Sequence, residues 1–253
     1  MRQLFIADLH LQPERPELFR AFRYFLDSIA RPGDTLYMLG DIFEYWIGDD
    51  APLPGLEPIF QRIRALSDAG SHIYFQHGNR DFLVGQTLMS RLGAELLPEA
   101  QRIELPTGAA LVMHGDQLCT DDTAYQQFRT QVRDPQWQQR FLSQPAEQRE
   151  AIARQMRQQS QQQGAMKTET IMDVNADAVR QTMLAHGVEL LIHGHTHRPH
   201  IHQHQIAPNR GERIVLGDWS ESGWYLLADE SGRELIRFTP GLTPKQDQAA
   251  ASS

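Results

Sequence analysis

Short apolar runs recur along most of this chain, and each of them gives way abruptly to polar residues. The runs are LFIA, TLYML, HIYFQ, AALVM and ELLI. Their length favours buried β-strands. The segments at 16–30, 57–69 and 85–92 instead repeat their apolar positions at helical spacing. Strands that alternate with helices in this way predict an α/β fold.

The first predicted helix illustrates the helical pattern. Pro16 stands in its first turn, a position that favours proline. One face of this helix carries the apolar residues Leu18, Phe19, Phe22, Phe25, Leu26 and Ile29.

The sequence predicts strands in the rest of the core. Segments 100–105 and 109–114, joined by Pro-Thr-Gly, predict a hairpin. After residue 197 we expect strands at 198–206, 212–217, 223–228 and 233–238. Turns are expected at Asn209-Arg210-Gly211 and Ser231-Gly232. The last residues, 241–253, are rich in Gln, Ala and Ser, and we expect them to form a disordered tail.

A Gln- and Arg-rich segment at 121–168 interrupts this core. Its prolines and start signals predict helices at 122–133, 135–142 and 145–162. The apolar face would consist of Tyr125, Phe128, Val132, Trp137, Phe141, Ile152 and Met156. This face either packs on itself as a small helical subdomain or forms a lid with an apolar cleft, and both can hold at once.

Polar motifs follow the five apolar runs. In order, they are Asp8-Leu9-His10, Gly40-Asp41, Gly78-Asn79-Arg80-Asp81, His114-Gly115-Asp116 and His193-Gly194-His195-Thr196-His197. If the strand ends converge at one edge, they bring together seven metal-ligating side chains. These are Asp8, His10, Asp41, Asn79, His114, His195 and His197.

The types of side chain in this set indicate the chemistry. Carboxylate, amide and imidazole groups suit borderline divalent ions, and the absence of thiolate argues against a closed structural zinc site. Two residues apart on an extended segment, Asp8 and His10 share a face, as do His195 and His197. Seven ligands, with Asp41 as a bridge, leave room for water and substrate on two ions. Such a pair generates hydroxide at neutral pH and clamps the oxygens of a phosphoryl transfer, which predicts hydrolysis of a phosphate ester or anhydride.

Each motif alone has a plainer interpretation. Gly-Asp and Gly-Asn are common turns, and the histidine motifs can be surface histidines. The ordered conjunction of all five favours the dinuclear site over a non-catalytic scaffold, which would be expected to have lost ligands. Elsewhere, we expect an exposed histidine ladder at 200–204 and an inert thiol at Cys119. The Tyr45-Trp46-Ile47 segment belongs either to the core or to an acyl groove.

The motif order over residues 8–197 resembles that of the calcineurin-like metallophosphoesterases. This resemblance implies a four-layer αββα sandwich. One ion would be held by Asp8, His10, Asp41 and His197, and the other by Asp41, Asn79, His114 and His195. Many members have histidine where this chain has Arg80. Arginine cannot act as a general acid at neutral pH, but its fork suits phosphate, so a phosphoanhydride with a good leaving group fits best.

Longer stretches resemble one branch of this family, the UDP-2,3-diacylglucosamine pyrophosphohydrolases. They are FEYWIGDD, GNRDFL, HGDQLCTDDTAYQ and IMDVN. The resemblance implies a Mn²⁺-dependent enzyme of lipid A biosynthesis that releases UMP and 2,3-diacylglucosamine 1-phosphate (lipid X) at the cytoplasmic face of the inner membrane. Cyclic-nucleotide phosphodiesterases and dinucleoside polyphosphate hydrolases would share the metal ligands, but they would lack the insertion and usually carry histidine in place of Arg80.

The same resemblance assigns the catalytic and substrate-binding residues. Asn79 and Arg80 would be catalytic. Substrate contacts would come from Asn79, Arg80, Asp122, Ser160, Lys167 and His195. The family usually has asparagine at position 164, where this chain has Gly164, so that side-chain contact is lost. The core would comprise residues 1–120 and 169–240, with 121–168 as the lid.

Composition sets bounds compatible with this interpretation. The 253 residues are 40% hydrophobic, enough for one sizeable α/β core. The single cysteine excludes an internal disulfide, and the start of the chain enters a strand at once, so we expect a cytoplasmic location. No apolar run approaches the roughly 18 residues of a membrane span, so membrane contact would be peripheral. A net charge of -8 disfavours nucleic-acid binding, and no protein partner can be inferred.

Overall fold

Two β-sheets form the centre of the molecule in a computed structural model, which describes residues 2–166, 173–206 and 209–241. The six-stranded sheet runs in the order β11-β10-β1-β2-β3-β4 and the five-stranded sheet in the order β5-β6-β7-β9-β8. The first comprises β1 (Gln3–Ile6), β2 (Thr35–Leu39), β3 (His72–Gln76), β4 (Ala94–Leu96), β10 (Gly223–Asp229) and β11 (Gly232–Phe238). The second comprises β5 (Ala100–Leu105), β6 (Gly108–Met113), β7 (Leu190–His193), β8 (His200–Ile206) and β9 (Asn209–Val215).

Parallel pairing brings the motif-bearing strands into line. Strands β1 to β4 are parallel, as are β6, β7 and β9, whereas the outer strands β5, β8, β10 and β11 pair antiparallel. The carboxyl ends of β1, β2 and β3 therefore lie at one edge of their sheet. The carboxyl ends of β6 and β7 lie together in the other sheet. Because these strands are buried on both faces, their sequences are nearly continuous apolar runs.

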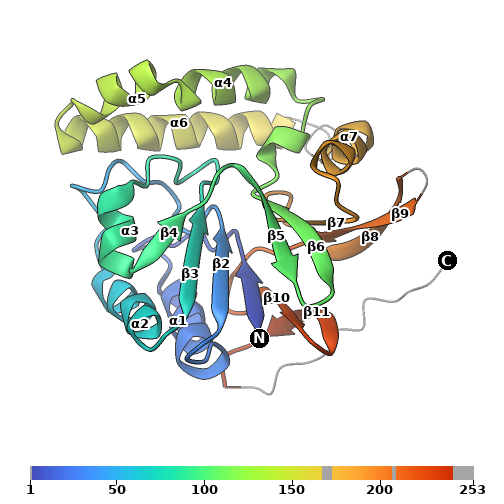
Figure 1. The fold of residues 1–253 in the computed structure, drawn as a ribbon. Helices are drawn as coiled ribbons and strands as arrows, with labels where there is room; N and C mark the ends of the chain where they lie inside the picture. The colour runs from blue at the N-terminus through green and yellow to red at the C-terminus, as the bar shows by residue number, and fades with distance from the viewer. Residues whose placement is uncertain (1, 167–172, 207–208, 242–253) are drawn as a thin grey trace.

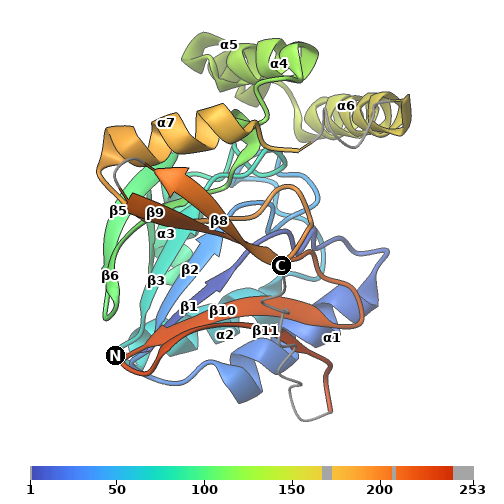
Figure 2. The ribbon, with the colours of Figure 1, turned by 90° about the vertical axis from the view of Figure 1, so that its right-hand side faces the viewer.

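The sheets pack on each other and on helices, which gives four layers (Figures 1 and 2). Between the sheets lie side chains such as Phe5, Tyr37 and Ile192. Helices α1 (Pro16–Tyr24), α2 (Glu57–Asp68) and α3 (Gln86–Leu92) cover the outer face of the first sheet. Helix α7 (Ala176–His186) covers the second sheet through Val179 and Met183. This confirms the predicted αββα sandwich.

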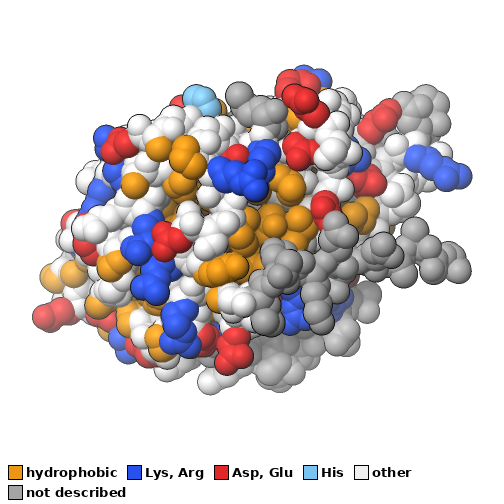
Figure 3. Space-filling model, turned by 90° about the horizontal axis from the view of Figure 1, so that it is seen from below, with side chains coloured by type: hydrophobic (Ala, Val, Ile, Leu, Met, Phe, Trp, Pro, Cys, Tyr) orange, Lys and Arg blue, Asp and Glu red, His pale blue; other side chains and the backbone are white. Residues whose placement is uncertain are grey.

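Three further helices lie across the carboxyl ends of the strands (Figure 1). They are α4 (Thr123–Arg133), α5 (Pro135–Leu142) and α6 (Ala146–Met166). Asp122 and Asp134 cap the first two, since each side chain accepts a backbone N–H in the first turn. The helices predicted in the insertion are confirmed, and α6 extends beyond the predicted end at residue 162. The face on the opposite side of the molecule carries hydrophobic and charged side chains of both signs (Figure 3).

Arginines tie these helices to the core at several places, among them Arg149 and Arg133. Arg149 of α6 is 2% exposed and donates hydrogen bonds to the backbone oxygen of Ile47 and to both carboxylate oxygens of Asp50. Arg133 of α4 donates a 2.9 Å bond to the backbone oxygen of Gly78, immediately before Asn79. The insertion is thus attached directly to the loops that carry the candidate site.

Several expectations are corrected by the structure. Asn209-Arg210-Gly211 is part of β9, paired with residues 204–206, because the chain there continues the antiparallel ladder instead of turning. The helix predicted at 16–30 ends as a π-helix over Phe25–Ile29. Strand β4 and helix α7 were not predicted, although Asn175 and left-handed Gly187 cap α7. The predicted tail from residue 242 onward lies outside the described residues. Within the described part of the chain, no helix is long and apolar enough to span a membrane.

Candidate metal centre and adjoining cavity

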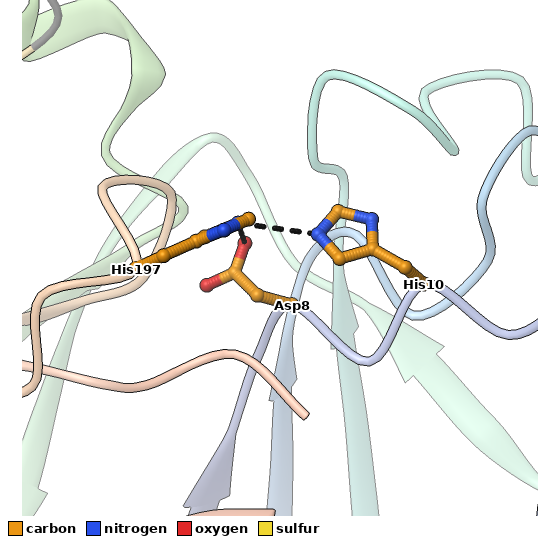
Figure 4. A group of neighbouring side chains, drawn as sticks. All are labelled: Asp8, His10 and His197. Carbon is orange, nitrogen blue, oxygen red and sulfur yellow. Dashed lines mark hydrogen bonds and ion pairs between the residues drawn. The ribbon is translucent and has the colours of Figure 1, made fainter. Parts of the chain in front are cut away.

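Loops at the carboxyl ends of five strands converge where the two sheets meet. Strand β1 leads to Asp8 and His10, β2 to Asp41, and β3 to Asn79, all in the first sheet. From the second sheet, β6 leads to His114, and β7 leads to His195 and His197. Figure 4 shows the side chains of Asp8, His10 and His197 pointing toward one another from opposite loops. The structure therefore brings together all seven of the predicted metal-ligating side chains.

The backbone at these positions adopts an unusual conformation. Asp8, His10, Asp41, His195 and His197 are the non-glycine residues with positive φ among the described residues, with φ between 50° and 68°. A left-handed conformation at such a residue costs about 1–3 kcal/mol and tends to occur at functional sites. All five are predicted metal ligands. The surrounding fold thus maintains strained loops where the candidate ligands are presented.

Asp8, His10 and His197 form the first group of ligand atoms. His197 Nε2 lies 3.2 Å from His10 Nε2 and 3.4 Å from Asp8 Oδ1. Asp8 Oδ1 is fully buried and has no hydrogen-bond partner among the described residues. Two imidazole nitrogens facing each other beside an unsatisfied carboxylate oxygen fit a divalent cation, which would satisfy all three atoms.

Asp41, Asn79, His114 and His195 form the second group. Asn79 Oδ1 lies 2.9 Å from His114 Nε2 and 2.8 Å from His195 Nδ1. His114 Nε2 is 3.7 Å from Asp41 Oδ1. His114 Nδ1 lies 2.9 Å from the backbone oxygen of Leu39 and donates its proton there, so Nε2 is the ring nitrogen that faces the other candidate ligands.

The two groups share a carboxylate. Asp8 lies near His10 and His197 on one side and near Asp41 and His114 on the other. Within each of these two sets of three residues, Asp8 included, the ligand atoms lie within 4.8 Å of one another. Asp8 is therefore central to the arrangement. The bridging role expected of Asp41 stays a prediction.

The ionisable side chains at this site strongly shift one another's pKa values. Burial opposes ionisation of Asp8, but the neighbouring histidines His197, His114 and His10 hold its pKa well below the usual range. Burial lowers the pKa of His197, yet the Asp8 carboxylate outweighs it and raises this pKa to about 9. Burial and nearby His114 lower the pKa of His195 to about 4, so its ring is neutral at pH 7 and has a lone pair for a metal.

Asp81 holds the Asp41 loop in place. Its carboxylate accepts hydrogen bonds from the backbone N–H groups of Asp41, Ile42 and Gly78 at 3.2, 2.8 and 2.8 Å. A Cβ at Gly78 would overlap Asp41, so glycine is required for this close approach. Asp81 thus supports the ligands without being one of them.

A cavity of about 520 Å³ opens beside the candidate metal centre. At its polar end lie Asn79, Arg80, His195 and His197. Apolar side chains from both the core and the insertion also line the cavity. They include Trp46, Phe82, Phe128, Trp137, Phe141 and Met156. Trp137 stacks on Phe141 at 5.2 Å, so this wall is built from packed aromatic rings.

The cavity also accounts for most of the predicted substrate-binding residues. Arg80, Asp122 and Ser160 line it together with Asn79 and His195. Lys167 lies outside the described residues. Position 164 is within α6, where the predicted side-chain contact is absent because the residue is glycine. Trp46 and Ile47 are buried in the core, which confirms the core interpretation, and Trp46 also lines the cavity. The acyl-groove interpretation of that segment stays a prediction.

Three polar residues of the cavity were not anticipated from the sequence. Glu44 lies between Arg80 and Arg157 and accepts hydrogen bonds from both. Tyr125, predicted only as part of an apolar face, stacks on the ring of His195 at 6.0 Å. Arg157 is one of several arginines on a Gln- and Arg-rich helix, and nothing local distinguishes it from them. Only the packing of α6 on the core shows its role.

Comparison with known proteins agrees with this architecture. The family model of the calcineurin-like phosphoesterases matches residues 1–199. A UDP-2,3-diacylglucosamine hydrolase of Hahella chejuensis is 49% identical over 94% of this chain and 98% of its own length. Another, from Serratia proteamaculans, is 48% identical over 94% of this chain and 99% of its own. The chain therefore belongs to the calcineurin-like phosphoesterases and, within them, to the family of UDP-2,3-diacylglucosamine hydrolases.

Among solved structures, a Vps29 mutant from Entamoeba histolytica is similar to the chain with a TM-score of 0.46 and 15% identity. That match covers 98% of this chain and 95% of the other.

Proposed function

We propose that this protein hydrolyses the pyrophosphate bond of UDP-2,3-diacylglucosamine to UMP and 2,3-diacylglucosamine 1-phosphate, a step in lipid A biosynthesis. The observation that carries this proposal is one continuous cavity. It is lined by candidate metal ligands and by three arginines, Arg80, Arg157 and Arg198, as well as by packed aromatic rings. A substrate with a pyrophosphate and two acyl chains needs both kinds of lining. The names of the relatives support the same substrate.

Two divalent ions, most simply Mn²⁺, are proposed to occupy the two groups of ligand atoms. Asp8, His10 and His197 would hold one ion, while Asn79, His114 and His195 would hold the other, with Asp41 between them. When bound, such ions activate water and neutralise charge on phosphoryl oxygens. The neutral His195 suits this role, and the bond from His114 Nδ1 to Leu39 turns Nε2 of His114 toward the other candidate ligands.

Arg80 is proposed to stabilise the charge that develops on phosphorus. Its backbone N–H donates to Asp41 Oδ1 at 2.8 Å, and its side-chain Nε lies 3.6 Å from Asp41 Oδ2. The guanidinium is therefore held beside the candidate metal centre. Arginine stays protonated at neutral pH and cannot donate a proton to the leaving group. A phosphoanhydride fits this limitation because its leaving group is a phosphate and needs no protonation.

Helices α4 to α6 are proposed to act as a lid that recognises the diacyl sugar. Asp122 and Ser160 line the cavity near its polar end and can hydrogen-bond a sugar or an acyl amide. The aromatic side chains of Phe82, Trp137 and Phe141 offer apolar surface to an acyl chain. Lys167 is proposed to add a charge contact to phosphate.

The lipid substrate places the reaction at a membrane surface. We propose peripheral contact with the cytoplasmic face of the inner membrane. Phe128 of α4 and Leu142 of α5 are 38% and 40% exposed, respectively. These side chains lie on the insertion, where a substrate would pass from the bilayer into the cavity.

The test is an assay in ¹⁸O-labelled water. Purified protein is incubated with Mn²⁺ and UDP-2,3-diacylglucosamine, and the products are separated and weighed by mass spectrometry. We expect UMP and 2,3-diacylglucosamine 1-phosphate, with the label in UMP if water attacks the α-phosphorus. Loss of turnover with EDTA and its recovery with Mn²⁺ are expected as well. Absence of both products at saturating Mn²⁺ would refute the proposed function.

A further inference from the structure

Glu44 is a nearly buried carboxylate at the rim of the cavity, 8% exposed. It follows β2 in a segment that runs parallel to the loop of His10. The backbone N–H of Glu44 donates a 3.1 Å hydrogen bond to the oxygen of Leu11, and Leu11 also forms a parallel bridge with Phe43. These bonds fix the backbone of Glu44 relative to the loop that carries His10.

The two carboxylate oxygens of Glu44 face different partners. Oε2 lies 3.3 Å from His10 Nδ1. Oε1 accepts hydrogen bonds from Arg80 Nη1, at 3.4 Å, and from Arg157 Nε. One side chain therefore contacts a candidate metal ligand and two of the arginines that line the cavity.

The approach of Glu44 to His10 distinguishes the two nitrogens of the ring. His10 Nε2 faces His197, inside the first group of ligand atoms, while Nδ1 faces Glu44. A carboxylate at Nδ1 stabilises the tautomer with its proton there, which leaves the lone pair on Nε2. Partners of this kind orient metal-binding imidazoles and raise metal affinity.

The contacts with the arginines have a second consequence. Two guanidinium groups placed side by side repel each other, and a carboxylate between them offsets that repulsion. It also restrains their long side chains, so less conformational freedom remains to be lost when a phosphate binds. Glu44 thereby adds to the contacts with Asp41 that hold Arg80 beside the candidate metal centre.

We propose that Glu44 is a positioning residue that acts on the reaction through both His10 and Arg80. It sets the tautomer of His10 for metal binding and holds the guanidinium of Arg80 beside the candidate metal centre. The part that concerns Arg80 rests on the proposed function, whereas the part that concerns His10 does not.

Glu44→Gln tests the contact with His10 without any substrate. The amide keeps the size of the side chain, but its one oxygen can accept from His10 or from the arginines and not from both, so the two arginines draw the oxygen and leave the NH₂ group facing Nδ1. After removal of metal with a chelator, calorimetric titration with Mn²⁺ should show affinity weakened by about 10–100-fold. The melting temperature of the metal-free variant should stay close to that of the wild type. Unchanged Mn²⁺ affinity would overturn the proposal.

Glu99→Gln is the matched control. Glu99 also forms ion pairs with two arginines, Arg129 and Arg133, but among the described residues it forms no ion pair with a histidine and does not line the cavity. The same loss of one charge there should leave Mn²⁺ affinity unchanged. An equal loss of affinity in both variants would mean that Glu44 acts only through net charge, contrary to the proposal.

A double-mutant cycle tests the contact with Arg80 at saturating Mn²⁺. Glu44→Gln should lower kcat by itself, and Arg80→Ala should lower it further. If Glu44 acts through Arg80, the double variant loses less than the product of the two single losses. Losses in kcat that multiply would overturn this part of the proposal.

Glu44→Asp serves as a second variant if the glutamine variant fails to fold. It keeps the charge that pairs with the arginines but shortens the side chain that reaches His10. We expect kcat at saturating Mn²⁺ to recover partly, while Mn²⁺ affinity stays weak. Wild-type values for both would overturn the proposal. Failure of the wild type to cleave UDP-2,3-diacylglucosamine would refute the proposed function and leave the Mn²⁺ titration valid.

Discussion

The hydroxyl of Tyr125 donates a 2.6 Å hydrogen bond to the carboxylate of Asp116. Tyr125 belongs to the first helix of the insertion, and Asp116 follows the loop of His114. Arg129 of the same helix donates to the same carboxylate oxygen at 2.8 Å. Because Tyr125 also stacks on His195, this contact links the insertion to the candidate metal centre.

We predict that Tyr125→Phe destabilises the protein by about 1–3 kcal/mol, because a buried carboxylate loses a hydrogen bond. Urea unfolding of the metal-free protein measures this loss. Tyr45→Phe is the control, since its hydroxyl makes only a 3.4 Å contact with Glu150 in a partly buried setting. Equal effects of the two substitutions would show that the Asp116 contact has no special weight.

We predict that Asn79→Ala abolishes both binding of the second Mn²⁺ and hydrolysis, because Asn79 Oδ1 lies between His114 and His195. Metal content after dialysis is measured by mass spectrometry. Asn175→Ala removes a different amide, one that caps α7. It should lower stability by about 0.5–2 kcal/mol and retain both ions. Two bound ions in Asn79→Ala would contradict the assignment.

We predict that Arg80→Ala keeps both ions but lowers kcat by about 10²–10³, the usual loss when a charge-stabilising group is removed from a transition state. Steady-state kinetics and metal analysis of the same preparation separate the two effects. Arg62→Ala, which removes an exposed arginine paired with Asp27, should behave like the wild type. Loss of metal from Arg80→Ala would instead show that Arg80 supports the ligands.

We predict that Ala153→Trp impairs cleavage of the diacylated substrate far more than cleavage of a small activated phosphodiester. Ala153 lines the cavity on α6, and an indole there would fill space needed by an acyl chain. The ratio of kcat/KM for the diacylated substrate to kcat/KM for the small phosphodiester measures this difference. Ala151→Trp on the same helix is exposed and should leave the ratio unchanged. A constant ratio in Ala153→Trp would place acyl recognition elsewhere.

We predict that Cys119 is inert to thiol reagents at pH 8 in the folded protein. Burial raises the pKa of this thiol to about 12, so almost no thiolate is present. Its pKa in the unfolded chain is near 9.0, so ionisation favours unfolding as the pH rises above that value. Labelling with an aromatic disulfide should be slow before and complete after denaturation. Rapid labelling of the folded protein would contradict this.

The sequence was sufficient to predict the strands that carry the motifs and the set of seven candidate ligands, whereas the αββα class was implied by the resemblance to the calcineurin-like metallophosphoesterases. The reason is that each ligand directly follows an apolar run, and parallel buried strands align their carboxyl ends. The three helices of the insertion were also predictable, because prolines and capping residues such as Asp122 and Asp134 mark their starts. Each of these signals depends only on residues that are close together along the chain.

Only the tertiary structure shows which side chains meet across the cavity. Glu44 and Arg157 are 113 positions apart, and their contact depends on how α6 packs against the loop after β2. The same holds for Tyr125 on His195 and for Asp8, which the structure places between both groups of ligand atoms. Such contacts arise from packing between distant segments, and neither periodicity nor spacing along the chain encodes where those segments come together.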